Sequence, residues 1–238
     1  MSNPVAAAPS LGHDGATPRA AIRAALDLIV EPNAVVELRV PHSRRGTLSG
    51  YFDDVDALVN IAADLSGRVE GVYVTLNPVD RALLARAVNR VSEYAKHTTA
   101  DNNIVRRRWM LVDFDPVRPS GISSTDEEHQ RGLARAREAR DWLREQGWNG
   151  LVFADSGNGA HLLARVDLPN DAPSLALVKK CLTALALRFS DNTVIVDEAT
   201  ANAARLVKCY GTVAAKGDAT QERPHRMARI LEVDEERR

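Results

Sequence analysis

The run at residues 109–115 restricts the fold of this chain more than any other stretch. It is apolar, it follows three arginines, and Pro116 comes after it, a pattern typical of a buried β-strand. Alternate side chains of a strand share a face, so Asp113 and Asp115 converge while Phe114 points into the core. Two carboxylates side by side at a buried strand end repel each other, and this arrangement is costly unless their charge is compensated.

Two explanations of the Asp113–Asp115 pair are open at this point. Mg²⁺ and Mn²⁺ prefer oxygen ligands and are usually held by one or two carboxylates plus substrate phosphates. Alternatively, the pair begins the next turn, because Asp-Pro is a common turn opener. Asp-x-Asp is a short motif, so the rest of the chain has to decide between a metal site and a turn.

The length and composition are those of an ordinary globular protein. The chain has 238 residues, 45% of them hydrophobic and 26% charged, enough for one large domain or two small modules. It has no apolar run as long as a membrane span and no secretion signal, so we expect a cytoplasmic protein without membrane association. The two cysteines, Cys181 and Cys209, are far apart, which fits a reduced protein and argues against structural zinc.

Local basic clusters are the only basis for inferring a nucleic-acid partner, because the formal net charge is −1. One cluster is the pair Arg44 and Arg45 in an expected turn. The other is the triplet Arg106, Arg107 and Arg108 directly before the Asp-x-Asp strand. We interpret both clusters as candidates for template contact, whereas the alternative for a charge run is a solvated face.

The first half of the chain predicts alternating helices and strands. We expect a disordered leader over residues 1–16, because Ala, Pro, Gly and Ser dominate it. Thr17 and Pro18 then open a helix, and Asp53 or Asp54 caps another that stops at Gly67. Further elements are expected as strands at 34–40 (ended by Pro41), 47–52 and 71–76 and a helix at 78–91. Residues 17–104 thus form an α/β module.

The second half, residues 105–238, predicts the order β-α-β-β-α-β. Thr125 and Glu128 form a capping box for a long helix that stops at Gly147. The other elements are expected at 151–154, 160–166, 173–189, 193–196, 206–210 and 227–233. This order is that of ferredoxin-like or RRM-like folds. The Glu- and Arg-rich end is either a frayed terminus or a cut linker.

A glycine-rich stretch, residues 156–161, is the second informative motif. Gly157 and Gly159 let backbone amides approach an anion, and His161 adds a donor on the outgoing strand. The Gly-Lys-Ser/Thr ending of a Walker A loop is absent. The alternative is a tight hairpin turn followed by an ordinary half-buried histidine.

Asp197 closes the short strand at 194–196 as Asp115 closes its own strand. Two strands ending in carboxylates at one sheet edge supply the three ligands of a two-metal site. The alternative is an ordinary helix N-cap or turn residue. Side chains suited to a triphosphate or a template backbone follow at Arg205, Lys208, Lys216 and Arg226.

The ordered set of these motifs resembles the archaeo-eukaryotic primase superfamily, and more narrowly the primase-polymerase domains of mobile-element replication proteins. The set is Asp113-x-Asp115, Ser156-Gly-x-Gly-x-His161, Asp197, and Arg205 followed by Gly211-Thr212 and Lys216, and the resemblance covers residues 34–231. It implies an α+β fold in which the N-terminal α/β module packs on an RRM-like palm, with the active site in the cleft between them.

The resemblance also implies roles for individual residues. Asp113, Asp115 and Asp197 would hold two divalent metal ions, Mg²⁺ or Mn²⁺. Nucleotide contacts would come from Ser156, Gly157, Gly159, His161, Arg205, Lys216 and Arg226. The cysteine-rich zinc element of many relatives is absent here, which leaves its primer-gripping role without a counterpart.

The activity that the resemblance implies is template-directed nucleotidyl transfer from NTPs or dNTPs on single-stranded DNA, starting or extending a primer. Because the chain has no ATPase motif, we expect a helicase or a helical accessory region in a longer parent protein.

Three other functions remain. A replication-initiator endonuclease would use a His-hydrophobic-His pair, which is absent among the six histidines. A nucleic-acid-binding module with an RRM-like fold and no polymerase activity is the main alternative. The last is a cyclase-like palm with the same metals.

Overall fold

The computed structural model describes residues 17–234, so the leader expected at residues 1–16 lies outside the described residues. The described part contains both helices and sheets, and the strand pairs in its sheets are antiparallel. The expected α+β class is thereby confirmed. No helix within residues 17–234 is both long and apolar enough to cross a membrane.

The helices begin where the sequence supplies caps. Thr17 caps α1 (Pro18–Ile29), Asp54 caps α2 (Val55–Leu65), and Thr125 caps α3 (Asp126–Glu145) through the expected capping box with Glu128. The last long helix is α4 (Ala172–Phe189), and the short 3₁₀ helices are η1 (Arg81–Arg86), η2 (Asp101–Asn103) and η3 (Glu198–Ala201).

The first sheet has the order β2-β1-β3-β8. Its strands are β1 (Val36–Ser43), β2 (Gly46–Phe52), β3 (Tyr73–Thr75) and β8 (Leu206–Lys208). The last of these comes from the second half of the chain and pairs with β3. The N-terminal sheet is therefore completed by a distant segment.

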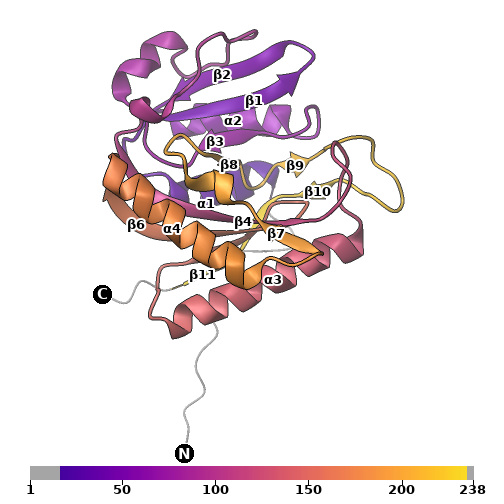
Figure 1. The fold of residues 1–238 in the computed structure, drawn as a ribbon. Helices are drawn as coiled ribbons and strands as arrows, with labels where there is room; N and C mark the ends of the chain where they lie inside the picture. Colours follow the sequence, from indigo (N-terminus) through magenta and orange to yellow (C-terminus); the bar gives the residue numbers. More distant parts are fainter. Residues whose placement is uncertain (1–16, 235–238) are drawn as a thin grey trace, which may run out of the picture.

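The second sheet has the order β11-β5-β6-β4-β7. Its strands are β4 (Arg106–Pro116), β5 (Val152–Asp155), β6 (Ala160–Pro169), β7 (Val194–Val196) and β11 (Arg229–Val233). A small hairpin of β9 (Val213–Ala214) and β10 (Arg226–Met227) precedes β11. In Figure 1, α3 and α4 cover one side of this sheet and the first sheet lies on the other.

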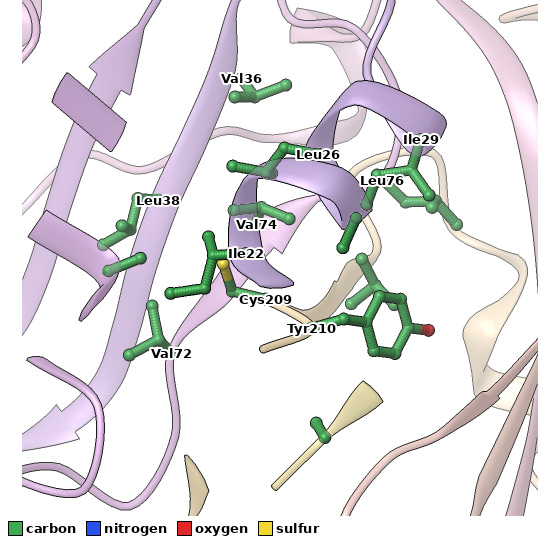
Figure 2. Packing of buried hydrophobic residues seen from close by; sticks show 14 of the residues in the cluster. Ile22, Leu26, Ile29, Val36, Leu38, Val72, Val74, Leu76, Cys209 and Tyr210 are labelled. Carbon is green, nitrogen blue, oxygen red and sulfur yellow. The ribbon is translucent and has the colours of Figure 1, made fainter. Parts of the chain in front are cut away.

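The two faces of β4 belong to different cores. Met110, Val112 and Phe114 pack in the cluster formed with α3 and α4. Trp109 and Leu111 pack in the cluster that contains α1 and the first sheet. Figure 2 shows this second cluster, with side chains of α1 against β1 and β3. The pleat of β4 thus decides which of its side chains face the space between the two sheets.

The helix expected at residues 78–91 is wrong. Only Arg81–Arg86 is helical, as a 3₁₀ helix; Val79 before it bridges Val35 and Ile104, and the segment after it follows the open edge of β2. The Tyr51 N–H donates to Ala87 O over 3.0 Å, and the Asn89 N–H donates to Tyr51 O over 2.8 Å. Pairing with a sheet edge satisfies backbone groups that a helix would have satisfied internally, so tertiary contacts override local helix propensity.

Some strand ends also differ from the expectation. β1 continues through Pro41, where its register against β2 shifts between Val40 and Ser43. Proline is tolerated at such an irregularity because it leaves no ladder hydrogen bond unmade. β3 is shorter than the expected strand at 71–76, whereas β6 runs three residues beyond the expected end at 166.

Candidate active site

Asp113 and Asp115 lie at the C-terminal end of β4, on the face that carries Trp109 and Leu111. Asp113 stands opposite His161 of β6, and Asp115 stands opposite Ile195 of β7. Their side chains are 29% and 56% exposed, respectively. The pair therefore sits where the core between the two sheets opens to solvent.

Asp197 reaches the same edge from the end of β7. Its backbone N–H donates to Asp113 O over 2.9 Å. Burial, and then the negative charges of Asp115 and Asp197, raise the pKa of Asp113 to about 7. The carboxylates are close enough to repel one another, so the structure brings the three acidic residues together.

The carboxylate oxygens of this trio are the atoms that would bind a divalent cation. As the side chains stand, residues 17–234 hold no group of three His, Cys, Asp or Glu side chains in position to bind a metal. Asp115 Oδ1 accepts from Arg118 Nη1 over 2.6 Å, and Asp197 Oδ1 accepts from the Ala199 N–H over 2.8 Å, which caps η3. The set still fits Mg²⁺ or Mn²⁺, because it offers only oxygen ligands and an excess of negative charge, but the carboxylates would have to turn toward one another.

His161 is buried beside the carboxylates. Its Nδ1 lies 2.8 Å from Tyr210 Oη, and its Nε2 lies 3.5 Å from Asp113 Oδ1. Burial, and then the charge of Lys208, lower the pKa of His161 to about 3. The imidazole is therefore neutral at physiological pH.

The glycine-rich stretch forms the tight turn between β5 and β6. The Ser156 N–H donates to Gly159 O, the Gly157 N–H to Asp155 Oδ1, and the Gly159 N–H to Ser156 Oγ. A Cβ at Gly159 would lie 2.2 Å from Phe114 O, so this glycine is required by close packing. The hairpin alternative therefore describes the turn, and contact of these amides with an anion would require their present bonds to open.

Of the basic residues expected at the nucleotide, one lies near the acidic trio and the others lie in different parts of the structure. Arg205 lies near the trio, since its charge lowers the pKa of Asp113, and its buried Nε has no hydrogen bond within residues 17–234. Arg226 is tied to the start of α3, where it donates to Ser124 O over 2.9 Å and pairs with Asp126 at 2.5 Å. Lys216 lies in the segment after β9.

The two arginine clusters expected at the template lie in different places and have different surroundings. Arg44 is exposed at the tip of the β1–β2 hairpin, and Arg44 and Arg45 both line a groove of about 870 Å³. At the start of β4, Arg106 pairs with Glu31 and Asp167.

The predicted contact with a template phosphate is wrong for Arg107 and Arg108, because these residues are only 4% and 9% exposed. The Arg107 guanidinium donates to Ala201 O over 2.7 Å, and that of Arg108 lies over the Trp109 ring. The start of the triplet is also remote from the carboxylates, because Arg106 and Asp115 are nine residue steps apart along β4, about 30 Å.

The sequence interpretation missed several residues at the site. Arg118 binds Asp115, and Tyr210 binds His161. A buried pair, His129 Nε2 and Asp155 Oδ1 at 2.8 Å, lies behind the glycine turn. Arg118 could have been found from its position three residues after Asp115, and Tyr210 from its place before Gly211-Thr212. Nothing in the sequence around His129 indicates its partner.

Comparisons with known proteins give similarity at the level of the fold. No protein-family model matches the chain, and no curated protein matches it. Among solved structures, the primase RepB' superposes with a TM-score of 0.50 at 13% identity, covering 91% of this chain and 56% of that one. The polymerase domain of Mycobacterium tuberculosis Ligase D, in complex with DNA, gives 0.47 at 15% identity over 87% and 77% of the two chains. This chain thus has a fold similar to that of a primase and spans little more than half the length of that primase chain.

Proposed function

We propose that this chain is a DNA primase-polymerase that transfers nucleotides from NTPs or dNTPs to a strand in a template-directed reaction. The observation that carries the proposal is the convergence of Asp113, Asp115 and Asp197, where burial and then the charges of Asp115 and Asp197 raise the pKa of Asp113 to about 7. A carboxyl group with a strongly raised pKa among other carboxylates at the opening of a core is typical of a functional site. The fold shared with the primase RepB' supports this reading.

The proposal includes the arrangement of the fold. Along the chain, these elements follow one another as β4, α3, β5, β6, α4 and β7, and in the sheet the four strands have the order β7-β4-β6-β5. This arrangement supports an RRM-like palm within residues 105–238. Residues 17–104 would form the second module, to which β8 contributes a strand. The active site would lie in the cleft between them.

In the proposed reaction, a strand 3′-hydroxyl attacks the α-phosphorus of the nucleotide, and the bond to the pyrophosphate breaks. Asp113, Asp115 and Asp197 would hold two divalent cations, which when bound lower the pKa of the attacking hydroxyl and stabilise charge on the pyrophosphate. Arg205, close to the trio, would neutralise phosphate charge. His161 would donate a hydrogen bond to a phosphate oxygen.

The template would run past the β1–β2 hairpin. Arg44 and Arg45 line the groove at its tip, and contacts of arginines with phosphates hold a strand without reading its sequence. Strand separation would fall to a helicase or a helical accessory region, since the chain has no Walker A motif.

Incorporation of labelled nucleotides on primed and unprimed single-stranded DNA, with Mg²⁺ or Mn²⁺, tests the proposal. We expect Asp113→Asn and Asp115→Asn to lower incorporation about a thousandfold or more, because each removes a cation ligand. Template binding should persist in both. Asp27→Asn is the matched control, since Asp27 lies on the surface of α1 in an exposed pair with Arg23.

Incorporation at the wild-type level by Asp113→Asn would refute the metal assignment. Template binding by the wild-type protein without incorporation would favour the nucleic-acid-binding alternative, and strand cleavage in a parallel assay would favour a nuclease.

A further inference from the structure

Tyr210 is the buried residue that links the core between the sheets to the candidate site. Its side chain is 1% exposed and belongs to the cluster around α1. In Figure 2 its ring lies at the border of that cluster, and its hydroxyl points away from the labelled aliphatic side chains. Within residues 17–234, the contact with His161 Nδ1 at 2.8 Å is the only hydrogen bond of this hydroxyl. A buried hydroxyl needs such a partner, so the tyrosine and the histidine depend on each other.

The direction of this hydrogen bond follows from the chemistry of the two groups. Burial, and then the charges of Asp113 and Asp155, raise the pKa of the Tyr210 phenol well above its usual range, so the phenol keeps its proton. With no other acceptor in the described structure, the O–H donates to Nδ1 of His161. Nδ1 must then be the unprotonated nitrogen, and a neutral imidazole carries its single proton on Nε2.

The Nε2 atom is the one that faces the acidic site, 3.5 Å from Asp113 Oδ1. The two rings also meet edge to face, with centroids 5.9 Å apart and planes at 69°, which restrains rotation of the imidazole. A proton on Nε2 attracts an anionic oxygen at this position. In the other tautomer, the lone pair of Nε2 would face that oxygen and repel it.

We propose that Tyr210 is a positioning residue that holds His161 in the Nε2–H tautomer, so that the histidine presents a neutral N–H donor to a phosphate oxygen of the nucleotide. The last clause rests on the proposed function, whereas the tautomer itself does not. Tyr210 does not touch the reacting atoms and acts only through His161.

The tautomer is tested first on the unmodified protein. Nitrogen-15 NMR of the histidine side chains, with the His161 signals identified by their loss in His161→Gln, should show a protonated Nε2 and an unprotonated Nδ1. In Tyr210→Phe, which removes only the hydroxyl, the signals should move toward a mixture of the two tautomers. An Nδ1–H tautomer in the wild-type protein, or an unchanged pattern in Tyr210→Phe, would overturn the proposal.

Kinetics of incorporation test the functional part. Tyr210→Phe should lower kcat/KM about tenfold, equivalent to about 1.4 kcal/mol. In a His161→Gln background the same change should lower it less than about twofold, because the residue through which Tyr210 acts is gone. Equal losses in both backgrounds would show a merely structural role and would overturn the proposal, as would no loss in the wild-type background.

Tyr51→Phe is the matched control. Tyr51 is also 1% exposed, and its hydroxyl accepts one hydrogen bond, from Arg86 Nη1 at 3.0 Å, but it lies on β2, outside the candidate site. It should change neither the His161 signals nor kcat/KM. If the wild-type protein incorporates no nucleotide, the proposed function fails, while the tautomer measurement still decides the role of Tyr210.

Discussion

Two carboxylates on inner strands of the sheets, Glu37 of β1 and Asp113 of β4, have opposite surroundings. Glu37 is 0% exposed, and burial alone would raise its pKa. Hydrogen bonds from Arg39, Ser49 and Thr99 outweigh burial, so the pKa of Glu37 is lowered. Arg39 Nη2 lies 2.5 Å from Glu37 Oε2, and the Thr99 N–H donates to the same oxygen over 2.9 Å.

Asp113 lacks such compensation. Burial, and then the charges of its neighbours Asp115 and Asp197, raise its pKa to about 7. Burial by itself therefore does not mark a carboxylate as functional. A buried carboxylate satisfied by its own protein stabilises the fold, whereas one surrounded by like charge has room for a positive ligand.

The largest effect on stability should come from removing the charge of Glu37, and removing the charge of Asp113 is the comparison. Glu37→Gln should lower the free energy of unfolding by about 3 kcal/mol, because it leaves the Arg39 guanidinium, only 15% exposed, without its counter-ion. Asp113→Asn should leave stability unchanged or raise it at pH 8, since it removes repulsion. Urea denaturation of both variants measures this, and a loss for Asp113→Asn as large as that for Glu37→Gln would contradict the comparison.

The pH dependence of stability sharpens the same contrast. The pKa of Asp113 rises from 3.8 to about 7 on folding, so the folded state holds the proton more tightly and stability falls as the pH rises from about 4 to about 7. We expect a decrease of about 2 kcal/mol for a side chain that is 29% exposed and partly screened by solvent.

For Glu37 the sign is reversed, because its pKa is lowered from 4.5. Its contribution is complete above pH 4.5 and is lost as the pH falls through its folded pKa. Urea denaturation from pH 5 to 8 with a chelator present should therefore show the decrease in the wild-type protein but not in Asp113→Asn. Parallel curves for the two proteins would assign the decrease to another group.

The smallest effect should come from added cations. If the acidic trio binds Mn²⁺, a free concentration ten times Kd should raise the free energy of unfolding by about 1.4 kcal/mol. The increase should vanish in Asp113→Asn and persist in Glu37→Gln, because Glu37 has no free capacity for a cation. Thermal unfolding with and without Mn²⁺ measures it, and an equal increase in all three proteins would place the binding elsewhere.

Local signals predicted much of the fold. Thr17, Asp54 and Thr125 cap helices where the sequence indicates, because a side chain that accepts from the first free amides acts within one turn. The helix expected at 78–91 failed because β2 had an open edge, which no local pattern reveals. The burial of Arg107 and Arg108 was missed for a similar reason, because a run of charged residues has the same sequence pattern whether or not distant elements cover it.

That Asp113 and Asp115 share a face follows from the amino-acid order alone, because the two-residue period of a strand is a property of the backbone. The meeting of Asp197 and His161 with this pair, and the contact of Tyr210 with His161, arise from the packing of distant segments. These contacts join segments 48 to 84 residues apart, counted from Asp113 to His161 and to Asp197. Such pairings depend on which apolar faces bury one another, and this choice is made by the whole chain at once.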